Sequence, residues 1–286
     1  GLAASVWSEN INRAIEVAAK VKAGVVWINA TNIFDAGAAF GGYRESGFGR
    51  EGGREGMAEY LSPAWEKGGK ARPAPALAIE VSPFTGKSDR ADIDVTAKLY
   101  IGGKQARPDG GYSLPIWSAK SKLLGHVGLG NRKDIRNAVE AAHAAKGWGK
   151  ATGHNRAQIL YYMGENLSAR AGEFAQRIKD QTGRDGADEV EAAINRLFTY
   201  AAWADKYDGA VKQVPMRAVA LAMNEPVGVI GALCPDEAPL LGFVSVMAPA
   251  IAMGNTCVLV PSQSAPLSAT DFYQVLETSD VPAGVV

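Results

Sequence analysis

The side chains of this sequence best suited to nucleophilic or metal chemistry are two cysteines and three histidines. Cys234 and Cys257 both lie in apolar runs, where a thiol packs as a small hydrophobic group. Two cysteines form no disulfide framework, which predicts a reducing, cytoplasmic location. His126, His143 and His154 lack the spacing of metal ligands. We therefore expect neither a catalytic residue nor a metal site among these side chains.

Glycine-rich segments are the second feature with chemical meaning, because phosphate-binding loops depend on them. Gly228 and Gly231 do not form the dinucleotide fingerprint. A denser segment, Phe40–Glu51 (FGGYRESGFGRE), opens a run with seven glycines between Phe40 and Gly56. Glycines permit backbone conformations that other side chains forbid. We expect this segment to hold such a conformation or to approach a neighbouring segment closely.

The composition argues against two classes of partner. The 286 residues carry thirty basic and thirty acidic side chains. This balance indicates neither nucleic acid nor an anionic surface as a partner. No apolar stretch approaches the roughly 20 uncharged residues of a membrane span. The sequence starts at Gly1 with neither an initiator methionine nor a signal peptide, so we expect a segment of a longer protein.

The first part of the sequence predicts a helix, a strand and then the glycine-rich loop. Ser8 can cap the helix through its hydroxyl, and Gly24 can stop it. Apolar residues recur between them at helical spacing, at Ile11, Ala14, Ile15 and Ala18. The short apolar run Val25–Asn29 (VVWIN) is typical of a strand buried on both faces.

A change in composition between Leu61 and Leu77 marks the predicted domain boundary. Prolines and glycines stand there among lysines and alanines, which is typical of a linker. We place the linker at residues 67–97, between a first part at residues 1–66 and a second part at residues 98–286.

The second part begins with Lys98–Tyr112 (KLYIGGKQARPDGGY), which predicts two strands joined by a Gly-Gly turn. Three helices follow, and Asn131 can cap the first, with Asp134 near its positive end. The apolar positions predicted to face the core are Ile135, Ala138, Val139 and Ala142 in the first helix, Ile159, Leu160, Met163 and Leu167 in the second, and Val190, Ala193, Ile194, Leu197, Tyr200 and Ala201 in the third.

From Val227 onward, predicted strands and helices alternate as VGVIGAL, PLLGFVSVMAPAIAM, TCVLV and LSATDFYQVL. Such alternation implies right-handed parallel crossovers. The predicted fold class is therefore α/β, with a doubly wound parallel sheet and helices.

Two motifs resemble one enzyme family but stand in reversed order. Phe40–Glu51 closely resembles the glycine-rich segment near the carboxyl end of the aldehyde dehydrogenase superfamily. Asn224–Leu241 (NEPVGVIGALCPDEAPLL) resembles a segment from the first half of the same enzymes. Residues 1–66 thus resemble the tail of one unit, and residues 98–286 the front half of a second. The arrangement resembles the tandem two-domain type (family sixteen), whose second unit is degenerate, and implies a fold incomplete at both ends.

The resemblance implies oxidation of an aldehyde to a carboxylic acid with NAD or NADP, which the first unit of the parent protein would bind. In the family a cysteine thiolate attacks the carbonyl and a glutamate activates water. The region that supplies both residues falls between the two parts of a normal unit. Neither Cys234 nor Cys257 matches the nucleophile's context. No catalytic residue is therefore assigned, and this segment alone is predicted to be inactive.

Matching the first part to the family places Ile33, Phe34 and Phe40 where a loop lines the aldehyde tunnel. An apolar, aromatic wall suits a substrate whose only polar feature is its carbonyl. The alternative is that Phe34 and Phe40 only pack the loop.

The second part departs from the family at three functional positions. Glu237 stands where an asparagine amide donates to the developing oxyanion, and a carboxylate there would repel it. Val260 and Gln263 stand where a lysine and a glutamate contact the adenosine ribose. We therefore expect no cofactor in the second unit. The alternative is natural variation in a working site.

Three hypotheses follow for the parent protein. The first is a tandem aldehyde dehydrogenase whose second unit is structural and pairs with the first within one chain, with a homodimer as a further assembly. The second is a nucleotide-binding sensor module in the second unit. The third is a circularly permuted, single active dehydrogenase. The number and position of cysteine-bearing middle regions in the parent sequence would separate the tandem and permuted arrangements.

Overall fold

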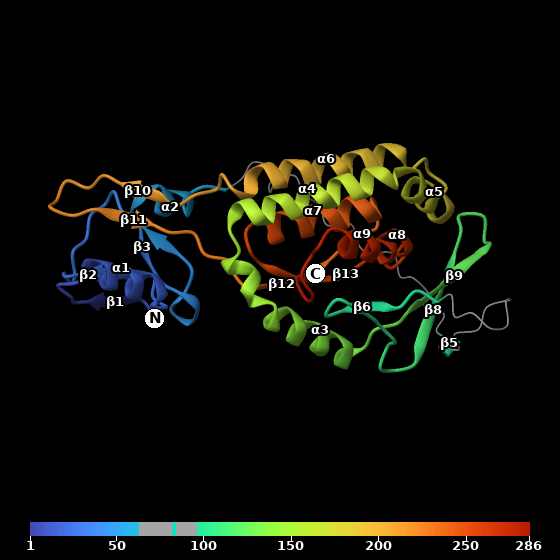
Figure 1. Cartoon of the computed structure of the whole chain (residues 1–286), viewed down its shortest axis with the longest axis horizontal. Coiled ribbons are helices and arrows are strands. Elements are labelled where there is room, and N and C mark those ends of the chain that lie inside the picture. The colour runs from blue at the N-terminus through green and yellow to red at the C-terminus, as the bar shows by residue number, and fades with distance from the viewer. Residues whose placement is uncertain (63–81, 84–95) are drawn as a thin grey trace. The chain divides into compact units, whose positions relative to one another are not determined.

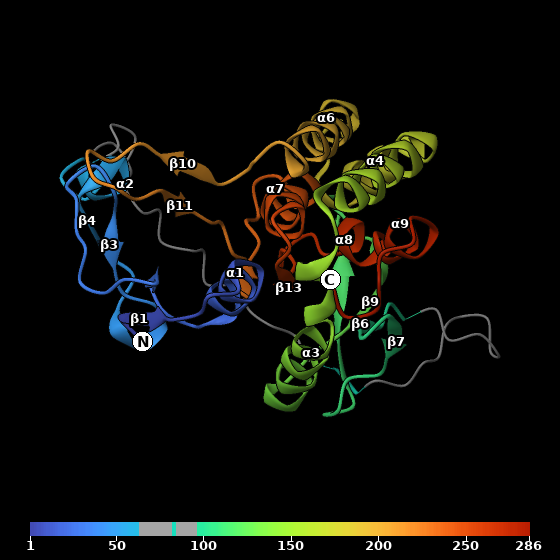
Figure 2. The same cartoon turned by 60° about the vertical axis from the view of Figure 1, so that its left-hand side comes forward.

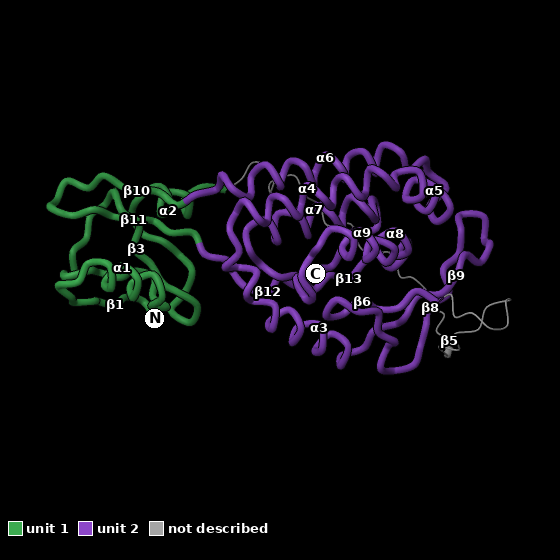
Figure 3. Tube along the Cα trace, viewed as in Figure 1, with its two compact units in different colours: residues 1–76, 209–224 green, residues 77–208, 225–286 purple. Residues whose placement is uncertain are grey.

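The computed structural model describes residues 1–62, 82–83 and 96–286. It divides into two compact units, residues 1–76 with 209–224 and residues 77–208 with 225–286 (Figures 1 and 3). Most of the predicted linker at residues 67–97 lies outside the described residues. The predicted boundaries between family units stay a prediction, because compact units and family units are different divisions.

Unit 1 is built on a parallel strand pair joined by a helix. Its elements are β1 (Ala3–Val6), α1 (Ile11–Lys20), β2 (Val25–Ile28), β3 (Phe40–Gly41), η1 (Arg44–Ser46), β4 (Arg50–Glu51), α2 (Gly53–Ala58), β10 (Ala210–Lys212) and β11 (Ala220–Ala222). β1 and β2 pair in parallel, while β3 with β4 and β10 with β11 pair antiparallel. The β10–β11 hairpin, which follows unit 2 helices in the sequence, thus belongs to the same compact unit as the glycine segment.

The predicted ends of the first helix are wrong. Helix α1 is capped by Asn10, whose side chain accepts a hydrogen bond from a first-turn amide at 3.1 Å. The Ser8 hydroxyl accepts instead from the Asn10 amide at 3.1 Å. The helix ends at Lys20, where the next residue turns extended, so Gly24 is not its stop.

The predicted burial of this region is also too high. The strand Val25–Ile28 is half-buried at every position rather than buried on both faces. Within the described residues it pairs only with β1, and α1 packs against it. In α1 only Ala14 is buried, while Ile11 and Ile15 are exposed. A two-stranded sheet offers too little surface to bury the whole apolar face of the helix.

Unit 2 combines two-stranded sheets and one three-stranded sheet, among its described residues, with a layer of helices. Its elements are β5 (Ser82–Pro83), β6 (Leu99–Ile101), β7 (Lys104–Ala106), β8 (Tyr112–Trp117), β9 (Leu123–Gly128), α3 (Arg132–Ala144), η3 (Lys146–Lys150), α4 (Gly153–Ala169), α5 (Ala171–Thr182), α6 (Ala187–Ala204), β12 (Val229–Leu233), α7 (Pro239–Ala252), β13 (Thr256–Val260), α8 (Leu267–Asp271) and α9 (Tyr273–Thr278). Helices α4, α6 and α7 lie side by side (Figures 1 and 2) and enclose the main core. β12 and β13 are parallel, with Ile230 opposite Cys257.

Several expectations for unit 2 are confirmed. Gly102 and Gly103, with φ of 61° and 74°, form the turn between β6 and β7. This left-handed conformation suits a two-residue hairpin turn. Asn131 caps α3 by accepting from two backbone amides, and Asp134 completes the cap. All four predicted core positions of α4 are buried.

Other elements of unit 2 were missed. Helix α5 carries only two large buried apolar residues, Phe174 and Ile178, too few for a clear helical pattern. Ile135 of α3, predicted to face the core, is 46% exposed. The last predicted helix is divided into α8 and α9.

Candidate functional site

The glycine segment of unit 1 makes the close backbone approach that its composition predicts. A Cβ atom on Gly24, just before β2, would lie 1.8 Å from the Gly41 carbonyl oxygen. A Cβ atom on Gly42 would lie 2.1 Å from the Ser46 carbonyl oxygen. Only glycine therefore lets β3 pass so near the start of β2. This approach places Phe40 beside the loop that follows β2.

Two side chains of the same motif hold its turn in place. Arg50 Nη1 donates to the carbonyl oxygens of Gly42 at 2.8 Å and Gly49 at 2.9 Å. The Ser46 hydroxyl accepts from the Tyr43 amide at 2.8 Å and donates to the Tyr43 carbonyl at 3.0 Å. These bonds satisfy backbone groups that the tight turn leaves without sheet partners. Ser46 and Arg50 thus stabilise the turn of the glycine segment.

The structure brings the three predicted lining residues together. The rings of Phe34 and Phe40 lie 5.0 Å apart at 81°, in edge-to-face contact. Phe34 is 57% exposed and Ile33 is 44% exposed. The apolar surface of these two side chains is thus partly open in this chain, and the alternative that they only pack the loop remains. Their role in lining an aldehyde tunnel stays a prediction.

Trp27 on β2 extends this cluster, and the sequence analysis did not single it out. Its ring lies 5.5 Å from that of Phe34 at 86°. Its Nε1 donates to the Ile33 carbonyl oxygen at 2.9 Å. An aromatic residue in the strand directly before an aromatic loop was the available signal. We call Trp27, Ile33, Phe34 and Phe40 the aromatic wall.

A second candidate site lies in unit 2, at the shared carboxyl edge of β12 and β13. Ligands of doubly wound sheets bind at such an edge. The three predicted degenerate positions are all exposed there: Glu237 after β12, Val260 at the end of β13, and Gln263 after it. The Glu237 backbone carbonyl accepts from Arg184 Nη2, which holds this loop to the segment before α6.

Asp236 occupies the same edge and was not predicted to matter. Its Oδ1 accepts from the Ser262 hydroxyl at 2.5 Å and from the Ser264 hydroxyl at 2.9 Å. The Ser262 hydrogen bond, more than any other cause, holds the pKa of Asp236 below its usual value. The carboxylate is therefore ionised at neutral pH and ties the loop after β12 to the loop after β13.

The edge is also negative at the start of α7. The Glu189 carboxylate accepts from the backbone amides of Leu240 at 2.8 Å and Leu241 at 3.2 Å. A helix N-terminus that could attract a phosphate is thereby already occupied by an anion. Asp236 and Glu237 lie nearby in the sequence, and the Val260 side chain cannot donate a hydrogen bond. That no cofactor binds at this edge stays a prediction.

Neither cysteine is suited to nucleophilic catalysis. Burial raises the pKa of Cys234 to about 11 and that of Cys257 to about 12. Both thiols are therefore protonated at neutral pH, whereas the thiolate is the attacking form. Among the described residues no cluster of His, Cys, Asp or Glu could hold a metal ion. No helix in the described part of the chain is long and apolar enough to cross a membrane.

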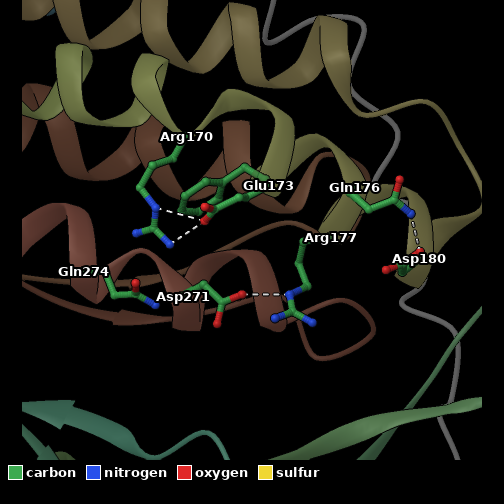
Figure 4. Close-up of a pocket in the computed structure, with 8 residues that line it drawn as sticks. Arg170, Glu173, Gln176, Arg177, Asp180, Asp271 and Gln274 are labelled. Carbon is green, nitrogen blue, oxygen red and sulfur yellow. Dashed lines mark hydrogen bonds and ion pairs between the residues drawn. The ribbon is translucent and has the colours of Figure 1, made fainter.

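A cavity of about 340 Å³ in unit 2, lined by α5, α8 and α9 residues, contains none of the predicted site residues (Figure 4). Arg170 pairs with Glu173 at 2.6 Å, and Arg177 pairs with Asp271 at 2.7 Å. Because each guanidinium already faces a carboxylate, the cavity presents no free positive charge to an anionic ligand. We assign it no ligand.

Comparison with known proteins matches both parts of the chain to one family. The model of the aldehyde dehydrogenase family matches residues 1–65 and 115–286. 2-Hydroxymuconic semialdehyde dehydrogenase of Pseudomonas putida is 34% identical over 177 residues, covering 58% of this chain and 36% of that protein. Aldehyde dehydrogenase B of Escherichia coli K12 is 31% identical over 193 residues, covering 65% and 38%. The chain thus spans just over a third of these curated relatives.

Solved structures agree with this match. An aldehyde dehydrogenase from Bacillus cereus in complex with NAD⁺ is similar with a TM-score of 0.65 and 27% identity, covering 67% of this chain and 40% of that one. A 3,6-anhydro-L-galactose dehydrogenase is similar in fold with a TM-score of 0.64 and 22% identity, covering 66% and 41%.

Proposed function

This chain belongs to the aldehyde dehydrogenase family and has part of its α/β fold, and we propose that it is a segment of a protein that oxidises aldehydes to carboxylic acids with NAD or NADP. The observation that carries this proposal is the aromatic wall. Ile33 and Phe34 remain exposed, although hydrogen bonds hold the nearby glycine segment in place. Such a surface suits the apolar part of an aldehyde.

We assign no catalytic residue within this chain, because Cys234 is half-buried, Cys257 is buried, and burial raises the pKa of both thiols so that they are protonated at neutral pH. The segment alone is therefore proposed to be inactive, and the cofactor is proposed to bind the first unit of the parent protein. Two free thiols support a location in the reducing cytoplasm.

The second unit is proposed to be non-catalytic and structural. The Asp236–Ser262 bond and the Glu189 contact to the start of α7 support this proposal, since both place negative charge where a nucleotide would bring its own. Arginine or lysine at the two positions that contact the ribose in the family would support the sensor alternative. Val260 and Gln263 supply neither.

Pairing of the two family units within the chain is supported by a contact in unit 1. Lys212 of the β10–β11 hairpin lies 2.9 Å from Glu55 of α2, which follows the glycine motif. The hairpin comes from the second part of the sequence, and α2 comes from the first. A homodimer of the parent protein is a further assembly that this contact does not require.

The same contact favours a second candidate, a circularly permuted dehydrogenase. In that arrangement the two parts belong to one catalytic unit, so their residues would share a compact unit, as residues 1–76 and 209–224 do. The parent sequence distinguishes the two candidates. A cysteine-bearing middle region before Gly1 supports tandem units, whereas one such region after Val286 alone supports permutation.

Cofactor reduction tests the proposed activity. The complete parent protein should reduce NAD or NADP with short and long aldehydes, and the 286-residue segment should match a heat-inactivated control. Turnover by the segment alone would contradict the assignment of catalysis to residues outside it. An inactive parent protein would contradict the proposed function.

A further inference from the structure

Trp27 contacts the loop of the aromatic wall in two ways. Its Nε1 donates to the Ile33 carbonyl oxygen at 2.9 Å, and its ring meets the Phe34 ring edge-to-face at 5.5 Å. One contact holds the backbone before Phe34, and the other holds the Phe34 side chain. Trp27 itself is half-buried on β2, so it is anchored in regular structure.

The start of the loop is fixed independently of Trp27. Asn29 adopts a left-handed conformation, with φ of 52°, and Asn32 does so with φ of 51°. The Asn29 side chain also accepts from the Ser8 amide at 2.8 Å and donates to the Ser8 carbonyl at 2.9 Å. These two positions turn the chain back toward β2. Beyond that turn, the Phe34 ring contacts the rings of Trp27 and Phe40.

We propose that Trp27 is a positioning residue that holds Phe34 in the orientation required to bind aldehydes with an aromatic ring. Phe34 meets both neighbours edge-to-face, at 86° and 81°, and is 57% exposed. It therefore presents aromatic surface to a flat substrate ring, and such contacts depend strongly on ring orientation. A two-carbon aldehyde has no ring to sense this orientation. This inference rests on the proposed function.

The test compares benzaldehyde with acetaldehyde in the complete parent protein. Trp27→Phe keeps an aromatic ring on β2 but removes the N–H donor. It should raise the KM for benzaldehyde about fivefold and the KM for acetaldehyde much less. Trp27→Leu removes both contacts and should raise the benzaldehyde KM about tenfold. Trp7→Phe is the matched control, because Trp7 is 66% exposed in the same unit, and it should leave both substrates unaffected.

A double-mutant cycle shows whether Trp27 acts through Phe34. Phe34→Leu should weaken benzaldehyde binding, and adding Trp27→Phe should then cost no further affinity. Additive losses, or equal changes for both aldehydes, would overturn the inference while leaving the proposed function intact. A parent protein inactive with both aldehydes would defeat both. A Trp27 variant that melts earlier but keeps the wild-type ratio of the two KM values would reduce Trp27 to a structural residue.

Discussion

The aromatic wall of unit 1 and the carboxyl edge of β12 and β13 in unit 2 differ in what their side chains leave exposed. In the wall and the glycine segment beside it, Trp27 and Arg50 donate hydrogen bonds to backbone carbonyl oxygens, and the apolar groups of Ile33 and Phe34 stay exposed. At the edge, the side chain of Asp236 is bonded to neighbouring serines. Polar groups that already hydrogen-bond to one another have few hydrogen bonds left to make with a ligand. The difference supports the proposal that ligand recognition is kept in the first region and lost in the second.

The largest effect should come from restoring ribose contacts at the edge. The chain with Val260→Lys and Gln263→Glu should bind NAD at least about a hundredfold more tightly than the natural chain, because each of the two charge-assisted contacts contributes about 1.5–3 kcal/mol. Isothermal titration calorimetry measures the change. Val219→Lys, at an exposed position of unit 1, controls for added charge. A micromolar dissociation constant in the natural chain would instead favour the sensor alternative.

The close approach of β3 to the start of β2 can be disrupted at Gly24. Gly24→Ala places a methyl group against the Gly41 carbonyl oxygen and should destabilise unit 1 by about 2–3 kcal/mol. Gly49→Ala is the matched control, since nothing lies within 4 Å of its added Cβ, and its effect should stay near zero. Chemical denaturation measures both. Equal stability of the two variants would mean that β3 does not pack as closely as described.

Low pH should weaken the hydrogen bonds by which Asp236 joins the loops after β12 and β13. Because hydrogen bonding lowers its folded-state pKa below 3.8, its stabilising contribution is present above the unfolded pKa and is lost as the pH falls through the folded value. Asp236→Asn should therefore lower the free energy of unfolding at pH 7. The loss should be less than about 1 kcal/mol, because the group is exposed. The difference between the two proteins should vanish once the pH has fallen below the folded-state pKa of Asp236. A difference that persisted unchanged in acid would show that the carboxylate charge is irrelevant.

The smallest effect concerns the pairing of the hairpin with the glycine segment. Lys212 and Glu55 are partly exposed, and the Lys212 hydrogen bond lowers the pKa of Glu55. A double-mutant cycle with Lys212→Met and Glu55→Gln should give a coupling of about 0.5 kcal/mol that declines with salt. The more exposed pair of Lys20 and Glu16 provides the comparison. No coupling at low salt would remove this support for pairing between the two parts of the chain.

Local chemistry made much of this protein predictable from its residues. The Gly-Gly turn at Gly102, the Asn131 cap and the buried positions of α4 depend on short-range rules, namely left-handed glycine, a side chain reaching a free amide, and helical spacing. The glycine-rich motif likewise predicted close backbone approach and family membership.

Tertiary structure decided what local patterns could not. The sequence contains both Trp27 and Phe34, but only folding places their rings at 86°. Asp236 and Ser262 are 26 positions apart, and they meet because β12 and β13 are parallel neighbours that end at one edge. Lys212 and Glu55 are separated by 157 positions, so no sequence pattern could predict their contact. Hydrogen bonds and ring contacts act over a few ångströms of space, and the path of the chain alone determines which distant residues come that close.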